Sequence, residues 1–246
     1  MTFSKILDQG KMSLHDKTPY QKKQIEVINK IERQINTNSI KFSMVTPTTD
    51  FDNDQRMCLT GVHFPHEKLL NIIENNLIAP LRKIQANHYY YSQDSLHLTI
   101  KNVRTVSSPP NFDKNDVTKV KIVFDKVIPK HHQFKAYFYR LLLFPSNLAL
   151  IGTVDPELDK IIFDLNENLD KINFPDDKQY TNNKYFFCNT TLVRFISPIS
   201  EEFKKKIINL SANVKLDPYT IDSVSLISGN AVLKKRQIFG TWFLSI

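Results

Sequence analysis

Apolar residues recur every three or four positions along several stretches of the chain, a spacing that predicts amphipathic helices. In the first stretch, residues 20–36, charged residues separate Ile25, Ile28 and Ile31. The same spacing predicts further helices over residues 66–82, 155–169 and 200–211. The apolar positions of residues 113–126 fit either a helix or a strand, and the pattern leaves that choice open.

Shorter apolar runs, several of them with alternating polar positions, predict β-strands. They cover residues 57–64, 88–91, 96–103, 134–144, 148–153, 184–195, 220–227 and 232–244. Turn-forming residues join two pairs of these runs, at Pro145-Ser146-Asn147 and at Ser228-Gly229-Asn230. The order of helices and strands predicts an α+β or mixed α/β architecture with two similar lobes.

A turn-rich segment, Thr46 to Gln55, separates the first predicted helix from the remainder of the chain. We therefore expect residues 1–55 to form an N-terminal extension and residues 56–246 to form the two-lobed domain. The length of 246 residues is within reach of one domain or of two small lobes that share a core.

The chain carries 33 basic and 25 acidic residues, a formal net charge of +8. Such an excess favours polyanionic partners such as RNA, nucleotides or anionic lipid, although a lysine-rich surface on any globular protein gives the same number. Glycine occurs only 5 times, and no stretch resembles GxxxxGKS/T or GxGxxG. The classical glycine-rich nucleotide folds are thereby excluded.

The two cysteines, Cys58 and Cys188, lie within apolar runs, which is typical of reduced, packed thiols in the cytosol. They form no CxxC pair, so we expect no zinc site. No run of about 18 apolar residues occurs, and the N-terminus has no apolar signal core. We therefore expect a soluble cytoplasmic protein without a membrane partner, of undetermined oligomeric state.

Candidate chemistry lies on the predicted strand that starts at Leu96. Because side chains alternate between the two faces of a strand, His97, Thr99 and Lys101 share one face and the apolar residues share the other. An imidazole exchanges protons near neutral pH, a hydroxyl can bind a phosphoryl oxygen, and an ammonium adds positive charge. A face of this kind suits an anionic ester.

A second predicted strand repeats part of this arrangement. Asn189 and Thr191 share one face, whereas Thr190 points the other way. Arg194 has the opposite parity to Thr191, so we expect it to brace the fold rather than to contact a ligand. On the strand of residues 88–91, Tyr89 and Tyr91 could stack a base at the mouth of a cleft, or could simply be buried on one aromatic face.

Together the two strands resemble the two-histidine phosphoesterase superfamily, which includes the RNA 2′,3′-cyclic phosphodiesterases, also called 2′-5′ RNA ligases. That family has two motifs of the form His-x-Thr/Ser-apolar, one in each lobe. Residues 97–100 match the first motif, and residues 189–194 match the second except that Asn189 stands in place of the histidine. The resemblance covers about residues 57–246 and implies an α+β fold of two pseudo-symmetric lobes, with antiparallel sheets around a central cleft.

The resemblance also implies roles for single residues. His97 would be the catalytic acid or base, Thr99 and Thr191 would hold the phosphate, and Asn189 would orient it. The mechanism that the resemblance implies needs neither a metal nor an organic cofactor. From their strand positions alone, Lys101, Tyr89 and Tyr91 could be further cleft contacts.

Asn189 leaves two function hypotheses open. An amide forms hydrogen bonds but does not transfer protons at neutral pH, and loss of one acid or base partner costs about 10²–10⁴ in rate. The protein could bind and hydrolyse 2′,3′-cyclic phosphates or 2′-5′ phosphodiesters of RNA or nucleotides. Alternatively, it is a catalytically inactive module that binds a nucleotide or RNA in the same cleft. A third hypothesis is a structural domain whose N-terminal helix docks a partner.

Overall fold

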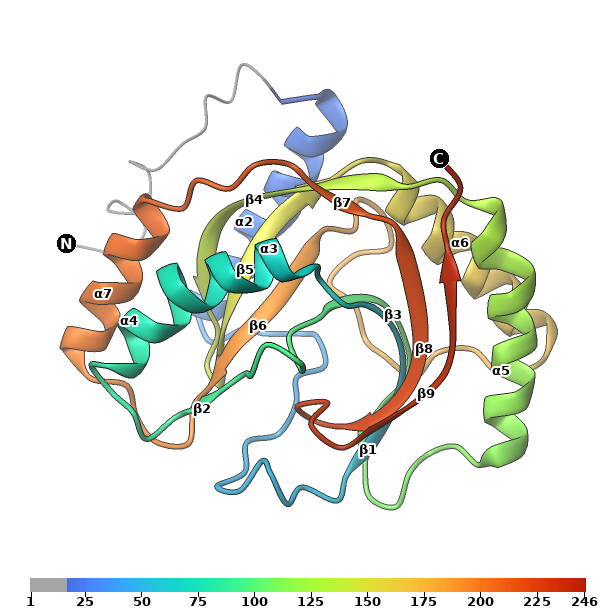
Figure 1. Cartoon of the computed structure of the whole chain (residues 1–246), viewed down its shortest axis with the longest axis horizontal. Coiled ribbons are helices and arrows are strands. Elements are labelled where there is room, and N and C mark those ends of the chain that lie inside the picture. Colours follow the sequence, from blue (N-terminus) through green and yellow to red (C-terminus); the bar gives the residue numbers. More distant parts are fainter. Residues whose placement is uncertain (1–16) are drawn as a thin grey trace.

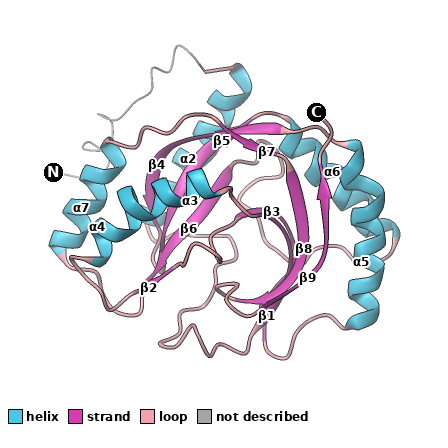
Figure 2. Cartoon of the chain, viewed as in Figure 1, coloured by secondary structure: helices cyan, strands magenta, loops and turns pink. Residues whose placement is uncertain are grey.

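The protein has two antiparallel sheets arranged around the middle of the molecule, with helices packed against them (Figures 1 and 2). A computed structural model describes residues 17–246, so residues 1–16 of the predicted extension lie outside the described part. The predicted α+β architecture with two antiparallel lobes is confirmed. No helix in the described part is long and apolar enough to cross a membrane.

One sheet has four strands in the order β3-β1-β8-β9, and each strand is antiparallel to its neighbours. The bounds are Met57–His63 for β1, Leu98–Ser107 for β3, Ser223–Asn230 for β8 and Arg236–Phe243 for β9. Helices α5 (Lys114–Val127) and α6 (Glu157–Lys171) pack beside this sheet, as Figure 1 shows on the right.

The other sheet has five strands in the order β2-β6-β5-β4-β7. The bounds are Tyr89–Tyr90 for β2, Phe134–Leu143 for β4, Asn147–Val154 for β5, Cys188–Arg194 for β6 and Tyr219–Ile221 for β7. Helix α7 (Glu201–Ala212) contacts β4. A single residue, Asp222, carries the chain from β7 in this sheet to β8 in the other.

The predicted N-terminal helix is confirmed as α2, Pro19–Asn36. Thr18 begins it with a reciprocal capping box, in which its side chain and that of Gln21 each accept a backbone N–H. Ile28 and Ile31, two of the isoleucines that predicted the helix, are buried against β4 and β5. Helix α2 is therefore packed onto the five-stranded sheet.

Residues 113–126, which fitted either element, form the helix α5. Asp113 favours the helix at its start, because its carboxylate accepts the backbone N–H of Asp116 and the Asp116 carboxylate accepts the backbone N–H of Asp113. The helix predicted over residues 66–82 is interrupted: α3 (Glu67–Ile73) and α4 (Ala79–Arg82) flank a π-helical turn, η3, at Glu74–Ile78. A short 3₁₀ helix, η4 (Ile128–Lys130), follows α5.

The turn predicted at Ser228-Gly229-Asn230 is wrong. All three residues belong to β8, because Gly229 and Asn230 pair with Cys58 and Met57 of β1. The connection to β9 is made by residues 231–235 instead. Cys58 and Cys188 are free, buried thiols, as expected.

Candidate functional site

The two motif strands, β3 and β6, meet although they belong to different sheets. The buried hydroxyl of Thr190 donates a hydrogen bond of 2.9 Å to the backbone carbonyl of His97. This bond joins the second residue of one motif to the first residue of the other. The strands that carried the resemblance are therefore neighbours in the fold.

Each motif strand has a β-bulge at the apolar residue after the threonine. On β3, Thr99 pairs with Val62 and Lys101 pairs with Gly61, so Ile100 has no partner. On β6, Thr191 pairs with Ala149 and Val193 pairs with Leu148, so Leu192 has none. A bulge reverses the alternation of the side chains that follow it. Both lobes thus have a β-bulge at the same position of the motif.

The bulges correct two expectations that assumed strict alternation. Asn102, rather than Lys101, joins Thr99 in lining the cavity between the strands. Arg194 lines the same cavity together with Thr191, although its parity had predicted a purely bracing role. Arg194 also braces the fold, because its guanidinium donates to the Tyr91 hydroxyl (2.9 Å) and to the Ala231 carbonyl (3.2 Å).

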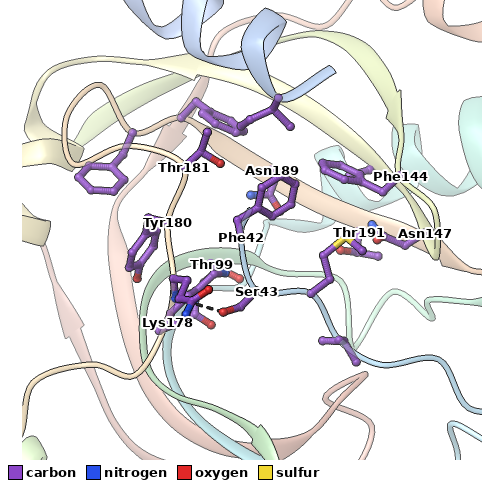
Figure 3. A pocket seen from close by; sticks show the side chains of 18 of the residues that line it. Phe42, Ser43, Thr99, Phe144, Asn147, Lys178, Tyr180, Thr181, Asn189 and Thr191 are labelled. Atoms are coloured by element: carbon purple, nitrogen blue, oxygen red, sulfur yellow. Dashed lines mark hydrogen bonds between the residues drawn. The ribbon is translucent and has the colours of Figure 1, made fainter. Parts of the chain in front are cut away.

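The cavity has a volume of about 230 Å³, slightly less than the roughly 300–1,000 Å³ of common small-molecule sites. Thr99, Asn189 and Thr191, the three predicted phosphate-binding residues, all line it. Figure 3 shows Thr99 and Lys178 on one side and Asn189 and Thr191 on the strand across from them. Apolar and aromatic side chains complete the wall: Ile31, Phe42, Phe144, Leu158, Ile162, Tyr180, Phe186 and Phe187.

Four of the polar side chains in the cavity are available to bind a ligand. The Thr99 and Thr191 hydroxyls, the Asn189 amide and the Lys178 ammonium form no hydrogen bond with any residue that the structure describes. Within residues 17–246, the cavity is lined by two cations, Lys178 and Arg194, and by no carboxylate, histidine or cysteine. Burial lowers the pKa of Lys178, although Asp176 opposes the shift. This combination suits an anion rather than a metal cation.

The N-terminal extension forms part of the cavity wall, which the sequence did not predict. Residues 42–45 line it, and the Phe42 ring lies edge-on to Phe144 with 6.4 Å between centroids. The Ser43 amide donates to the Gln179 carbonyl, and the Gln179 amide donates to the Ser43 hydroxyl. The extension and the loop that precedes β6 are therefore tied together beside the two motif strands.

His97, the predicted catalytic residue, is not among the residues that line this cavity. It precedes the first residue of β3, and its Nδ1 lies 2.8 Å from the Ser95 carbonyl. Burial, helped by the nearby positive charges of Arg194 and Arg236, lowers the pKa of His97 to about 4. The imidazole is therefore neutral at physiological pH.

The three further cleft contacts expected from the sequence also lie outside the lining. Lys101 is buried, and its ammonium is bound by Asp176 and Asn166. Tyr91 is fully buried, and Tyr89 packs edge-on to its ring. Tyr91 is therefore a buried core residue, which is the second of the two alternatives that the sequence left open.

No family model and no curated protein matches the chain. Solved structures do match. A conserved protein of unknown function from Agrobacterium tumefaciens, ATU0111, has 11% identity and a TM-score of 0.53 over 88% of this chain and 97% of its own. LigT from E. coli in complex with phosphate has 13% identity and a TM-score of 0.47 over 78% of this chain and 99% of its own.

TT0787 of Thermus thermophilus has 11% identity and a TM-score of 0.49 over 77% of this chain and 98% of its own. Another similar structure is described as a phosphoesterase. At these identities the likeness concerns the fold alone. The likeness to ATU0111, whose TM-score exceeds 0.5, supports the two-lobed fold formed by the two antiparallel sheets.

Proposed function

We propose that the cavity between β3 and β6 binds a small phosphate ester, such as a nucleotide 2′,3′-cyclic phosphate or the phosphate end of an RNA. One observation carries the proposal: Thr99, Asn189 and Thr191 converge with Lys178 and Arg194 on a single cavity. Hydroxyl and amide groups donate to phosphoryl oxygens, and the two cations offset the charge. The aromatic wall offers apolar surface for a base or a sugar.

Residues 42–45 of the N-terminal extension limit the size of ligand that the cavity can hold. Since residues 42–45 form part of the wall and the cavity measures about 230 Å³, the space suits one nucleotide rather than a length of duplex. An RNA would enter by its terminal nucleotide, with the remaining chain outside.

Binding is better supported than hydrolysis. Acid–base cleavage of a phosphodiester needs one group to accept a proton and another to donate one. His97 is outside the lining, and Asn189 cannot exchange protons at neutral pH. We therefore propose that the protein recognises a phosphate ester without turning it over.

Hydrolysis remains the second candidate because of one residue. Lys178 lines the cavity, and its pKa is lowered by burial, so its ammonium is a better proton donor than an exposed lysine. If turnover occurs, Lys178 is the group expected to carry the proton that the absent histidine would carry.

Calorimetric titration with 2′,3′-cyclic AMP tests the proposal. Lys178→Met should weaken binding by about tenfold or more, since it removes a charged contact of about 1.5–3 kcal/mol. Lys23→Met is the matched control, because it removes the same charge from the exposed face of α2. Equal affinities for Lys178→Met and the wild type, or no binding by the wild type at millimolar ligand, would refute the proposal.

A further inference from the structure

A second group of ligand-type side chains lies where the chain crosses between the two sheets, apart from the residues that line the cavity. His63 is the last residue of β1, His66 is the N-cap of α3, and Asp222 is the single residue between β7 and β8. Each offers one nitrogen or oxygen atom, and these three atoms lie within 4.8 Å of one another. Three separate elements thus bring two imidazoles and a carboxylate to one point.

The spacing of the donor atoms fits a small transition-metal ion. Nε2 of His66 lies 3.0 Å from one carboxylate oxygen of Asp222, and Nδ1 of His63 lies 3.8 Å from the other. Two ligands that each bind tetrahedral zinc at about 2.0–2.1 Å are themselves separated by about 3.3 Å. The two donor distances to Asp222 lie within about 0.5 Å of that separation, and all three donors lie within 4.8 Å of one another.

The surroundings of His63 hold its ring in place for such a role. Its side chain is fully buried, with Nδ1 2.9 Å from the Ser223 carbonyl and Nε2 2.7 Å from the Tyr219 hydroxyl. The same hydroxyl accepts the backbone N–H of His66. An ion at Nδ1 would replace the proton that this nitrogen donates to the Ser223 carbonyl, and Nε2–H would then donate to the Tyr219 hydroxyl. Hydrogen bonds to the distal nitrogen of this kind orient metal-bound histidines.

We propose that His63, His66 and Asp222 bind one divalent transition-metal ion, with zinc as the expected metal and water in the remaining position. Two imidazoles and one carboxylate suit zinc, cobalt, nickel or copper, whereas calcium and magnesium prefer oxygen ligands throughout. The His66 side chain is 60% exposed and the Asp222 side chain 25% exposed, so an ion can enter from solvent.

The consequence of binding is structural. An ion at this point ties the end of β1 and the start of α3 to the crossover between the five-stranded and four-stranded sheets. Because an ion that binds only the folded state stabilises it, zinc should raise the melting temperature. The cysteine spacing had predicted no zinc site, and the third ligand lies 156 residues after His66 in the chain.

The test uses the full chain, stripped of metal with a chelator and then titrated with Zn²⁺ by calorimetry and with Co²⁺ by visible absorption. We expect one Zn²⁺ per chain, a tetrahedral Co²⁺ spectrum and a raised melting temperature. His66→Ala and Asp222→Asn should each weaken binding by at least about tenfold and abolish the thermal shift. Both residues are exposed enough for the variants to fold, which circular dichroism would verify.

His132→Ala is the control, because it removes an exposed histidine elsewhere on the surface and should leave Zn²⁺ binding unchanged. Binding of 2′,3′-cyclic AMP should also be unchanged in His66→Ala, which separates this site from the cavity. The proposal is overturned if the wild type binds no stoichiometric Zn²⁺ at micromolar concentrations, or if His66→Ala and Asp222→Asn bind it as the wild type does.

Discussion

Two adjacent threonines of β6 provide a test that separates the fold from the site. Thr190 is fully buried, and its hydroxyl donates to the His97 carbonyl across the two sheets. Thr191 points the other way, lines the cavity, and has no hydrogen-bond partner among the described residues. Replacement of either residue by valine exchanges a hydroxyl for a methyl group of similar size. The two variants therefore differ only in what each hydroxyl contacts.

Thr190→Val should destabilise the protein without affecting ligand contacts directly. The half-buried His97 carbonyl would lose the hydrogen bond from the Thr190 hydroxyl, which costs about 0.5–1.5 kcal/mol. In a chain of 246 residues, each kcal/mol lowers the melting temperature by about 2–4 °C. Calorimetric melting and urea unfolding measure the loss directly.

Thr191→Val should have the opposite effect. Its free energy of unfolding should change by less than about 0.5 kcal/mol, since no internal hydrogen bond is lost. Its affinity for 2′,3′-cyclic AMP should fall by about tenfold or more, because a hydrogen bond to a charged phosphate contributes about 1.5–3 kcal/mol. A Thr190→Val protein as stable as the wild type would refute the strand pairing, and a Thr191→Val protein with wild-type affinity would refute the phosphate site.

Other parts of the structure give three further predictions. His97 should titrate near pH 4 by NMR. Its contribution to the free energy of unfolding should fall as the pH drops from 6.5 toward 4, because the unfolded state takes up the proton first. A pKa at or above 6.5 would contradict its burial. Gly152→Ala should lower the free energy of unfolding in urea by about 1–3 kcal/mol. The added Cβ would lie 2.8 Å from the Cys188 sulfur and 3.0–3.1 Å from the β4 backbone. A variant as stable as the wild type would contradict this close packing. Phe42→Ala should speed hydrogen exchange at the Ser43 amide, because the contact with Phe144 is lost; unchanged exchange would show that the extension is held without it.

Much of the fold was predictable because its determinants are local. The helical spacing of the isoleucines in residues 20–36 identified α2, and the alternating runs located all the long strands within a few residues. The exceptions have physical reasons. The helix over residues 113–126 is indicated by the capping pair of Asp113 and Asp116 and not by its apolar spacing, which fits a strand equally well. Gly229 and Asn230 resemble a turn by composition, but pairing with β1 keeps them in a strand.

The site was predictable only in part, because strand parity fails at a bulge. Thr99, Asn189 and Thr191 precede the bulges in their strands, and the structure brings all three to one cavity. Lys101 and Arg194 follow the bulges, so their predicted faces were reversed. The repeated motif position of the two bulges becomes visible only in the pairing register.

Two contributors to the cavity could not be found from the motifs at all. Lys178 lies in a loop, and residues 42–45 belong to the extension, outside the part of the chain that carried the resemblance. Both reach the site through long-range contacts, such as the paired hydrogen bonds between Ser43 and Gln179. A basic residue in a turn-rich loop has no periodic pattern to mark it.

The central claim, a phosphate-ester site that binds but does not turn over its ligand, is tested most directly by ³¹P NMR of 2′,3′-cyclic AMP with the purified protein. The account predicts that the cyclic phosphate resonance shifts or broadens on addition of wild-type protein, less so with Thr191→Val, and that no 2′- or 3′-phosphate resonance grows. Growth of a product resonance at a rate that falls in His97→Ala would contradict it and establish an enzyme. An unperturbed resonance at millimolar ligand would contradict the binding site itself.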